Sequence, residues 1–150
     1  MNCAQGGVMI LSLCLSVAIA ANPFRVEVQP LSVIENEVKD VLVTFVVPEG
    51  HHLYQDMMSV VPKTTDGLTF SSPIFPIGQL KTDPANPDQM REVFEASVQV
   101  KVPVTSDRSS VYTTELTVQY QGCKDTLCYM PKSEIIPVTI EVIRPSKKQK

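Results

Sequence analysis

The chain has 150 residues and a formal charge of −3, from 13 basic and 16 acidic side chains. This length suits one domain, and the mildly acidic balance argues against nucleic acid as a partner, because nucleic-acid-binding surfaces are basic. Tryptophan is absent, and twelve prolines divide the chain into short segments. Frequent turn signals of this kind are typical of all-β proteins.

The first 21 residues carry no charged side chain and hold an apolar run from Val8 to Ala20. This run is shorter than the roughly 20 apolar residues that a membrane span needs. It ends in Ala18-Ile19-Ala20, a small-x-small pattern that is typical of signal-peptidase sites. We predict a signal peptide over residues 1–21, cleaved near Ala20 or Ala21, and an exported protein. An uncleaved N-terminal anchor is the alternative.

From Phe24 onward, apolar side chains recur at every second position, which is the period of a half-buried strand. The predicted strands cover residues 24–29, 40–47, 51–61, 68–70, 94–102, 112–120 and 136–142, with a short edge strand within 31–39. The dense apolar run at 40–47 suggests burial on both faces. Residues 71–89 contain four prolines and no regular period, so we expect a long loop there.

Roughly seven to nine strands without a helix predict an all-β fold, an immunoglobulin-like antiparallel β-sandwich. A small β-barrel is the alternative. Pro137 lies inside the last predicted strand and lacks an N–H group, so it should sit at a sheet edge or a bulge. The predicted domain covers residues 22–143 and is followed by a short basic tail at 144–150.

Cys123 and Cys128 are separated by four residues, and the other two cysteines, Cys3 and Cys14, lie in the predicted leader. The exported form would therefore keep one pair, between strand-like segments. A disulfide across so short a loop should stabilise the fold by only about 2 kcal/mol. A disulfide at the tip of a hairpin stabilises the fold only weakly but is accessible to other molecules, which favours a redox-active disulfide. A structural disulfide and a metal site remain open alternatives.

The metal alternative is a soft copper site built from the thiols together with histidine and methionine side chains. Its candidate ligands are His51, His52, Met57, Met58, Met90 and Met130. Neighbouring residues on a strand face opposite sides, so His51 and His52 cannot both reach one site. Zinc spacing is missing, and we expect neither a metal nor a cofactor. Next to the pair, Gly122 should let the backbone turn before Cys123 and leave room for a partner.

Two segments then resemble a known family. Tyr120-Gln121-Gly122-Cys123, followed by Cys128-Tyr129-x-Pro131 and an apolar strand, is similar to the motif of the N-terminal periplasmic domain of the DsbD thiol:disulfide interchange family. Pro48 to Tyr54 resembles that family's turn, aromatic pair, leucine and tyrosine. The order and spacing match over most of the stretch from Phe24 to Val142.

The resemblance implies a periplasmic thiol:disulfide oxidoreductase with the immunoglobulin-like fold and with Cys123 and Cys128 as catalytic residues. Cys128 would be the exposed attacking thiol and Cys123 the resolving one, with Tyr54, Gly122 and Tyr129 as active-site neighbours. The implied partners are a thioredoxin-like domain or a membrane electron transporter of the DsbD type, and oxidised periplasmic proteins. A non-enzymatic immunoglobulin-like binding module and a copper-handling module are the rival functions.

The sequence departs from the family pattern in three ways. Members of the family have five residues between the cysteines, whereas this chain has four. The family's cap loop, which shields the disulfide with an aromatic side chain, would fall between Gly78 and Met90, where this chain has no aromatic residue. The family's membrane and thioredoxin-like domains are not in this sequence, so we expect either that they are separate chains or that this is a stand-alone relative with its own partner.

Overall fold

The computed structural model describes residues 21–84 and 86–147. The predicted leader lies outside the described residues except for Ala21, and so does the end of the predicted basic tail. The strands in chain order are β1 (Arg25–Val28), β2 (Leu31–Ile34), β3 (Lys39–Val46), β4 (His51–Tyr54), β5 (Ser59–Pro62), β6 (Thr69–Phe70), β7 (Gln79–Asp83), β8 (Asn86–Phe94), β9 (Val98–Thr105), β10 (Ser110–Tyr120), β11 (Gly122–Lys124), β12 (Leu127–Cys128) and β13 (Lys132–Ile143). A short 3-10 helix, η1 (Gln55–Met57), follows β4.

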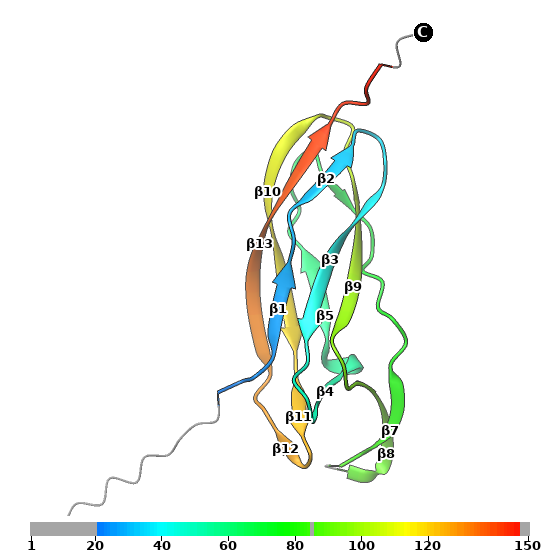
Figure 1. The fold of residues 1–150 in the computed structure, drawn as a ribbon, viewed down its shortest axis with the longest axis vertical. Helices are drawn as coiled ribbons and strands as arrows, with labels where there is room; N and C mark the ends of the chain where they lie inside the picture. Colours follow the sequence, from blue (N-terminus) through cyan, green and yellow to red (C-terminus); the bar gives the residue numbers. More distant parts are fainter. Residues whose placement is uncertain (1–20, 85, 148–150) are drawn as a thin grey trace, which may run out of the picture.

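Two four-stranded sheets form a sandwich along the long axis of the molecule (Figure 1). The first sheet has the order β1-β3-β9-β6 and the second has the order β2-β13-β10-β5. All their pairings are antiparallel except that of β2 with β13, which is parallel. The predicted immunoglobulin-like β-sandwich is confirmed. Pro137 of β13 pairs with β10 on one side, and β2 pairs with β13 only from Ile140 onward. The other side of Pro137 is therefore a sheet edge, as predicted.

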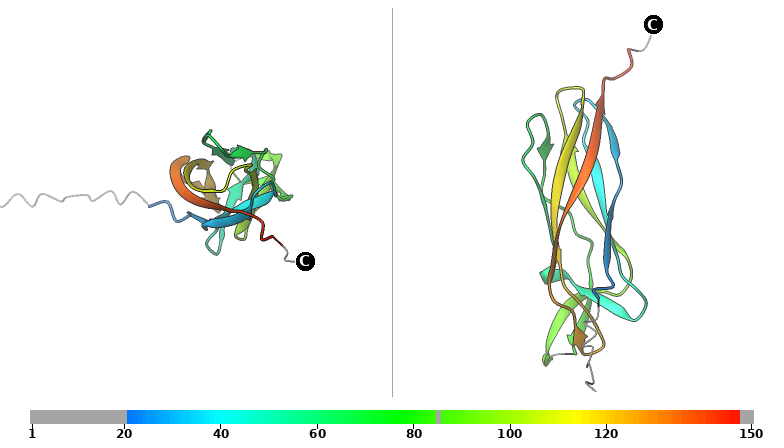
Figure 2. Two further views of the ribbon diagram at one scale, coloured as in Figure 1. Left: turned by 90° about the horizontal axis from the view of Figure 1, so that it is seen from above. Right: turned by 90° about the vertical axis from the view of Figure 1, so that its left-hand side faces the viewer.

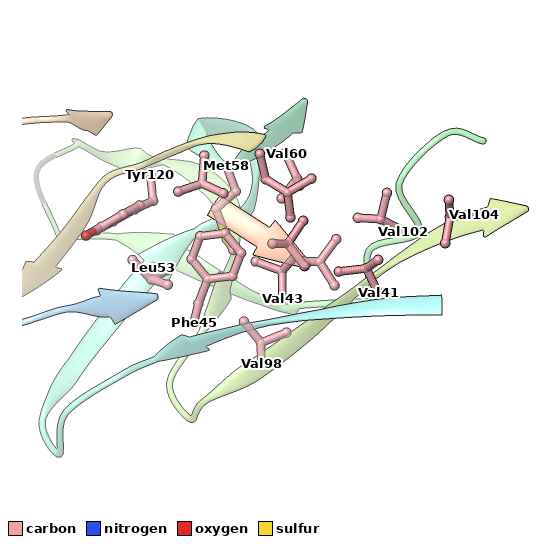
Figure 3. Packing of buried hydrophobic residues seen from close by; sticks show 14 of the residues in the cluster. Val41, Val43, Phe45, Leu53, Met58, Val60, Val98, Val102, Val104 and Tyr120 are labelled. Atoms are coloured by element: carbon pink, nitrogen blue, oxygen red, sulfur yellow. The ribbon is translucent and has the colours of Figure 1, made fainter. Parts of the chain in front are cut away.

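The core lies between the inner faces of these two sheets, and its packing is shown in Figure 3. Every second residue of β3 and β9 is buried, as the period of two predicts. β10 and β13 contribute the facing set, which includes Leu116, Val118 and Ile140 at 0% exposure. Burial of these aliphatic side chains is the main term that holds the sheets together.

A third, five-stranded sheet with the order β12-β11-β4-β8-β7 lies at the end of the sandwich opposite to the C-terminal tail (Figures 1 and 2). We call it the rim sheet. Two hairpins build it: β11–β12 carries the cysteines, and β7–β8 lies on the other side of β4. The sandwich thus serves as the base on which the rim sheet presents the cysteine pair.

Four of the predicted elements were wrong. The expected strand at 51–61 is interrupted by η1, so that β4 joins the rim sheet and β5 joins the sandwich. Most of the expected loop at 71–89 is the β7–β8 hairpin, because its strands satisfy their backbone groups on each other although their side chains follow no simple alternation. The expected strand at 94–102 is broken between Phe94 and Val98, and Ala96 is exposed there. The strand predicted to be buried on both faces, β3, alternates instead, with Leu42 37% exposed, because only one of its faces meets the other sheet.

Candidate functional site

The cysteine pair forms a cross-strand disulfide at the tip of the rim sheet. Cys123 in β11 and Cys128 in β12 are directly opposite in register, with their Cα atoms 4.0 Å apart and a bond between their sulfurs. Asp125, with a φ of 51°, turns the chain between the two strands. Cys123 is completely buried, whereas Cys128 is exposed. The two sulfurs therefore differ in access, and a protein partner could reach Cys128 first.

Tyr54 connects the exposed cysteine to a buried acid. Its hydroxyl lies 3.9 Å from Cys128 Sγ and donates a hydrogen bond of 3.0 Å to Asp83 Oδ1. Burial, and then the hydrogen bond to Asp83, raise the pKa of Tyr54, so the phenol keeps its proton at neutral pH. Because the O–H is directed at the carboxylate, the oxygen lone pairs remain available on the side of the sulfur.

Arg91 of β8 forms an ion pair with the buried carboxylate of Asp83. Its guanidinium carbon lies 3.7 Å from the centre of the Tyr54 ring, and its Nη1 is 3.6 Å from Asp83 Oδ2. It also pairs with Asp56 of η1. A guanidinium over a tyrosine ring gains a cation–π interaction in addition to its ion pairs. The β7–β8 hairpin thus places an Asp–Arg pair beside the cysteines, in the region where the resemblance places the cap loop.

His52 lies on the same face of the rim sheet as the disulfide. It is the register partner of Cys123, and its ring packs edge-on against Tyr54 with centroids 5.1 Å apart. Its Nε2 is buried, and within the described residues it has no hydrogen-bond partner. Burial is the largest cause that lowers the pKa of His52, and the pKa stays below its usual value although the carboxylates of Glu95 and Asp83 act to raise it. The imidazole is therefore neutral at neutral pH.

The opposite face of the rim sheet holds an aromatic cluster that positions Tyr129. The Nδ1 of His51 lies 2.9 Å from the carbonyl oxygen of Glu49, which can only accept, so in the neutral ring this nitrogen carries the hydrogen. The Nε2 then accepts a hydrogen bond of 3.2 Å from the Tyr129 hydroxyl. Phe24 packs edge-on against both rings. As predicted, His51 and His52 face opposite sides.

The expected role of Gly122 is wrong. Gly122 is a buried residue within β11, opposite Leu53, and is not a turn residue. A Cβ atom at this position would lie 2.3 Å from Cζ of Phe24 and 2.5 Å from the carbonyl oxygen of His52. Glycine is therefore needed so that β11 can approach β4 and the aromatic cluster closely. The residue makes room for the domain's own side chain and leaves no opening for a partner.

Apolar side chains surround the exposed sulfur. A shallow hollow of about 440 Å³ lies beside Cys128 and is lined in part by Leu127, Tyr129 and Met130. Leu127 is 57% exposed and Met130 is 83% exposed. Exposed apolar side chains gathered around a reactive group are typical of a surface that another protein covers.

Among the described residues, no three side chains of histidine, cysteine, aspartate or glutamate come together in a way that could hold a metal ion. Within the same residues, no helix has the length and apolar character needed to cross a membrane.

Comparison with known families decides the relationship. Residues 22–140 match the family described as the thiol:disulfide interchange protein DsbD, N-terminal. This chain belongs to that family. The DsbD protein of Salmonella typhimurium is 30% identical over 104 residues, and that of Salmonella choleraesuis is 30% identical over 101 residues. These alignments cover 67% of this chain but 16% of each DsbD protein, so the chain spans about a sixth of the length of these relatives.

Two solved structures of DsbD N-terminal domains share the fold. The reduced form of the Neisseria meningitidis domain is 25% identical, with a TM-score of 0.53 over 68% of this chain and 78% of that one. The same organism's DsbD N-terminal domain in complex with the PilB N-terminal domain is 21% identical, with a TM-score of 0.59 over 81% of this chain and 87% of that one.

The structure brings together most of the residues that the sequence singled out, and adds others. Cys123, Cys128, Tyr54, Gly122 and Tyr129 all lie in or against the rim sheet. Asp83 was missed because it lies in the segment predicted as a loop, and Arg91 was missed because it lies between that loop and the next predicted strand. His52 was considered only as a metal ligand. Its position two residues before Tyr54 was the available signal, since residues i and i+2 of a strand share a face.

Proposed function

We propose that this DsbD-family chain is a periplasmic thiol–disulfide exchange domain that carries two electrons as the Cys123–Cys128 dithiol. It would receive electrons from a thioredoxin-like domain or a membrane transporter of the DsbD type. It would pass them on to oxidised exported proteins. The observation that carries the proposal is the asymmetry of the disulfide, with one exposed and one buried sulfur held opposite each other on two short strands.

In the donating direction, the exposed Cys128 thiolate attacks a disulfide of the oxidised protein. A mixed disulfide forms and one substrate thiolate leaves. Cys123 then attacks the Cys128 sulfur, which closes the domain's disulfide and releases the second substrate thiolate. Two electrons and two protons pass to the substrate. The register pairing supports the second step, because it keeps the resolving sulfur next to the bond that it must break.

A folded protein partner fits the surface around Cys128. Leu127 and Met130 present exposed apolar side chains beside the sulfur, and the Neisseria meningitidis DsbD domain is known in complex with another protein domain. Docking over this patch would bury the apolar surface and bring a partner cysteine to Cys128. The donor and the acceptor would then use the same face in turn, because both must reach the same sulfur.

The proposal predicts that the disulfide is reducible under biological conditions. Equilibration with glutathione or thioredoxin should give a reduction potential above about −300 mV, the level below which structural disulfides typically lie. In the reduced protein, alkylation should modify Cys128 about tenfold or more faster than Cys123, because the reagent must reach the thiolate. Mass spectrometry of the digested protein measures both rates.

Single-cysteine variants supply the matched control. In cells, Cys123→Ala should accumulate mixed disulfides through Cys128, since the resolving thiol is missing, and Cys128→Ala should trap no partner. A potential well below −300 mV, together with equal trapping by the two variants, would instead identify the bond as a structural staple of a binding module.

A further inference from the structure

The rim sheet places a histidine in line with the two cysteines. Cys128 is opposite Cys123 across β11–β12, and Cys123 is opposite His52 across β11–β4. Directly opposed residues of an antiparallel pair point to the same face, with Cβ atoms about 4.5–5.5 Å apart. Cys128, Cys123 and His52 therefore form one row on one face, with the buried sulfur in the middle.

The imidazole in this row has an unused nitrogen. Nε2 of His52 is buried, and no group among the described residues hydrogen-bonds to it. A buried polar atom without a partner destabilises a fold, so such an atom calls for an explanation. In the disulfide state shown here, Cys123 has no proton to offer. On reduction, Cys123 becomes a buried thiol on the residue directly opposite His52 in the register of β11 and β4.

We propose that His52 takes the proton from the Cys123 thiol when that sulfur resolves a mixed disulfide. This inference rests on the proposed exchange function and names a further residue for it. The resolving thiol has a difficulty that Cys128 does not share. It is completely buried, and burial disfavours the thiolate that must attack. A neutral base on the same face removes that difficulty.

The proposed step balances as follows. The Cys123 S–H proton moves to Nε2 of His52, and the resulting thiolate attacks Cys128 Sγ. The Cys123–Cys128 bond forms while the bond between Cys128 and the substrate sulfur breaks. The substrate sulfur leaves with the electron pair of that bond. The imidazolium then gives its proton to the departing thiolate or to water, and His52 returns to its neutral form.

The surroundings keep His52 available as a base. Burial lowers the pKa of His52, and Lys81 and Arg91 act in the same direction. Glu95 and Asp83 act against them, and Lys81 and Glu95 also form an ion pair with each other. Tyr54 packs against the ring. Asp125 and His52 both line a second hollow, of about 470 Å³, which is distinct from the one beside Cys128. The net effect of these groups is a His52 pKa below the usual value of 6.5. At neutral pH the imidazole is therefore neutral and able to accept a proton.

The resolving step can be timed separately from the attack. Reduced protein is mixed with one equivalent of dithiobis-nitrobenzoate, an aromatic disulfide that releases one coloured thiolate when Cys128 attacks and a second when Cys123 closes the ring. At pH 7, we expect His52→Gln to slow the second release about 100-fold, since a positioned base typically contributes about 10²–10⁴. The first release should change by less than about twofold, because His52 does not take part in it.

The pH profile distinguishes a proton acceptor from a structural residue. In the unaltered protein, the rate of the second release should rise through an inflection below pH 6.5, as His52 loses its proton. In the variant, the inflection should move to about pH 8.5 or above, where the thiol ionises without help. His52→Phe keeps a ring against Tyr54 and should behave like His52→Gln. His51→Gln, the same change on the opposite face, should keep the low inflection.

The outcomes separate the two proposals. A normal first release, with a second release that is unchanged in rate and pH profile in both His52 variants, would overturn the role of His52 and leave the exchange function intact. If the unaltered protein releases neither thiolate, the exchange function itself fails. Circular dichroism of the variants establishes that each one is folded, and His52→Phe covers the case in which His52→Gln is not.

Discussion

At the scale of single residues, the site is a chain of contacts from the exposed sulfur to a buried charge. Tyr54 donates its hydrogen to Asp83 and leaves its oxygen facing Cys128, so it offers an acceptor to a thiol and no donor to a thiolate. Asp83, at 5% exposure, adds a negative charge one hydrogen bond further away. Both features favour the protonated form of reduced Cys128 over its thiolate.

Replacing Asp83 should therefore make Cys128 more reactive at low pH. We expect Asp83→Asn to lower the pKa of the reduced Cys128 thiol, because the carboxylate charge is removed and Arg91 remains close by. Thiolate absorbance or the pH dependence of alkylation measures this change. The reduction potential should rise as well, since a more stable thiolate favours the reduced state.

Asp56→Asn is the matched control for this prediction. Asp56 pairs with the same guanidinium, but its side chain is 64% exposed, whereas that of Asp83 is 6% exposed and accepts the hydrogen bond of Tyr54. Its removal should leave Cys128 nearly unchanged, because an exposed ion pair contributes little. If both variants shift the thiol equally, or if Asp83→Asn raises its pKa, the electrostatic account of this contact chain is wrong.

At the scale of elements, the short β11 strand depends on a close approach to β4. Gly122 lies where a Cβ atom would collide with Phe24 and with the backbone oxygen of His52. The second contact cannot be relieved by a rotamer change, so the strand itself must move. Since β11 holds both the buried cysteine and its register with His52, any movement of this strand disturbs the row of Cys128, Cys123 and His52.

Gly122→Ala should accordingly destabilise the protein by about 2–3 kcal/mol, the upper range for overpacking a tight site. Denaturant unfolding measures this free energy. Gly50→Ala is the control, because Gly50 has a φ of +74° and nothing within 4 Å of the added Cβ. It should cost only the backbone strain, about 1 kcal/mol. Equal losses for the two variants would show that β11 tolerates the extra atom.

The elements also show what sequence alone could predict. The sandwich strands were found because one face of each meets a continuous core, which imposes a period of two on the residues. The β7–β8 hairpin was missed because it projects beyond that core, and all but one residue of β7 is exposed. Its pattern reflects contacts with Tyr54 and η1, which are made between segments far apart in the chain. Asp83 and Arg91 could therefore not be assigned.

At the scale of the whole molecule, most of the stabilising core lies apart from the disulfide. The main cluster of buried residues fills the sandwich, whereas buried Cys123 belongs to a small second cluster with Tyr54 and Val93. Figure 2 shows the rim hairpins extending beyond the end of the sandwich. This division suits an electron carrier, because the bond can open and close without disturbing the contacts that keep the domain folded.

Reduction should consequently change stability very little. Closing a loop of this size is worth about 2 kcal/mol at most, and the flanking strands already hold the two cysteines together. The dithiol form should unfold in one cooperative transition, with an unfolding free energy no more than about 2 kcal/mol below that of the disulfide form. Denaturant titrations with and without dithiothreitol measure the difference.

Ile140→Ala is the control, because it leaves the cysteines intact but opens the main core. It should lower the unfolding free energy by more, about 2–5 kcal/mol. If reduction instead costs as much as this core substitution, the bond is a staple, and the proposed separation between carrier and core does not hold.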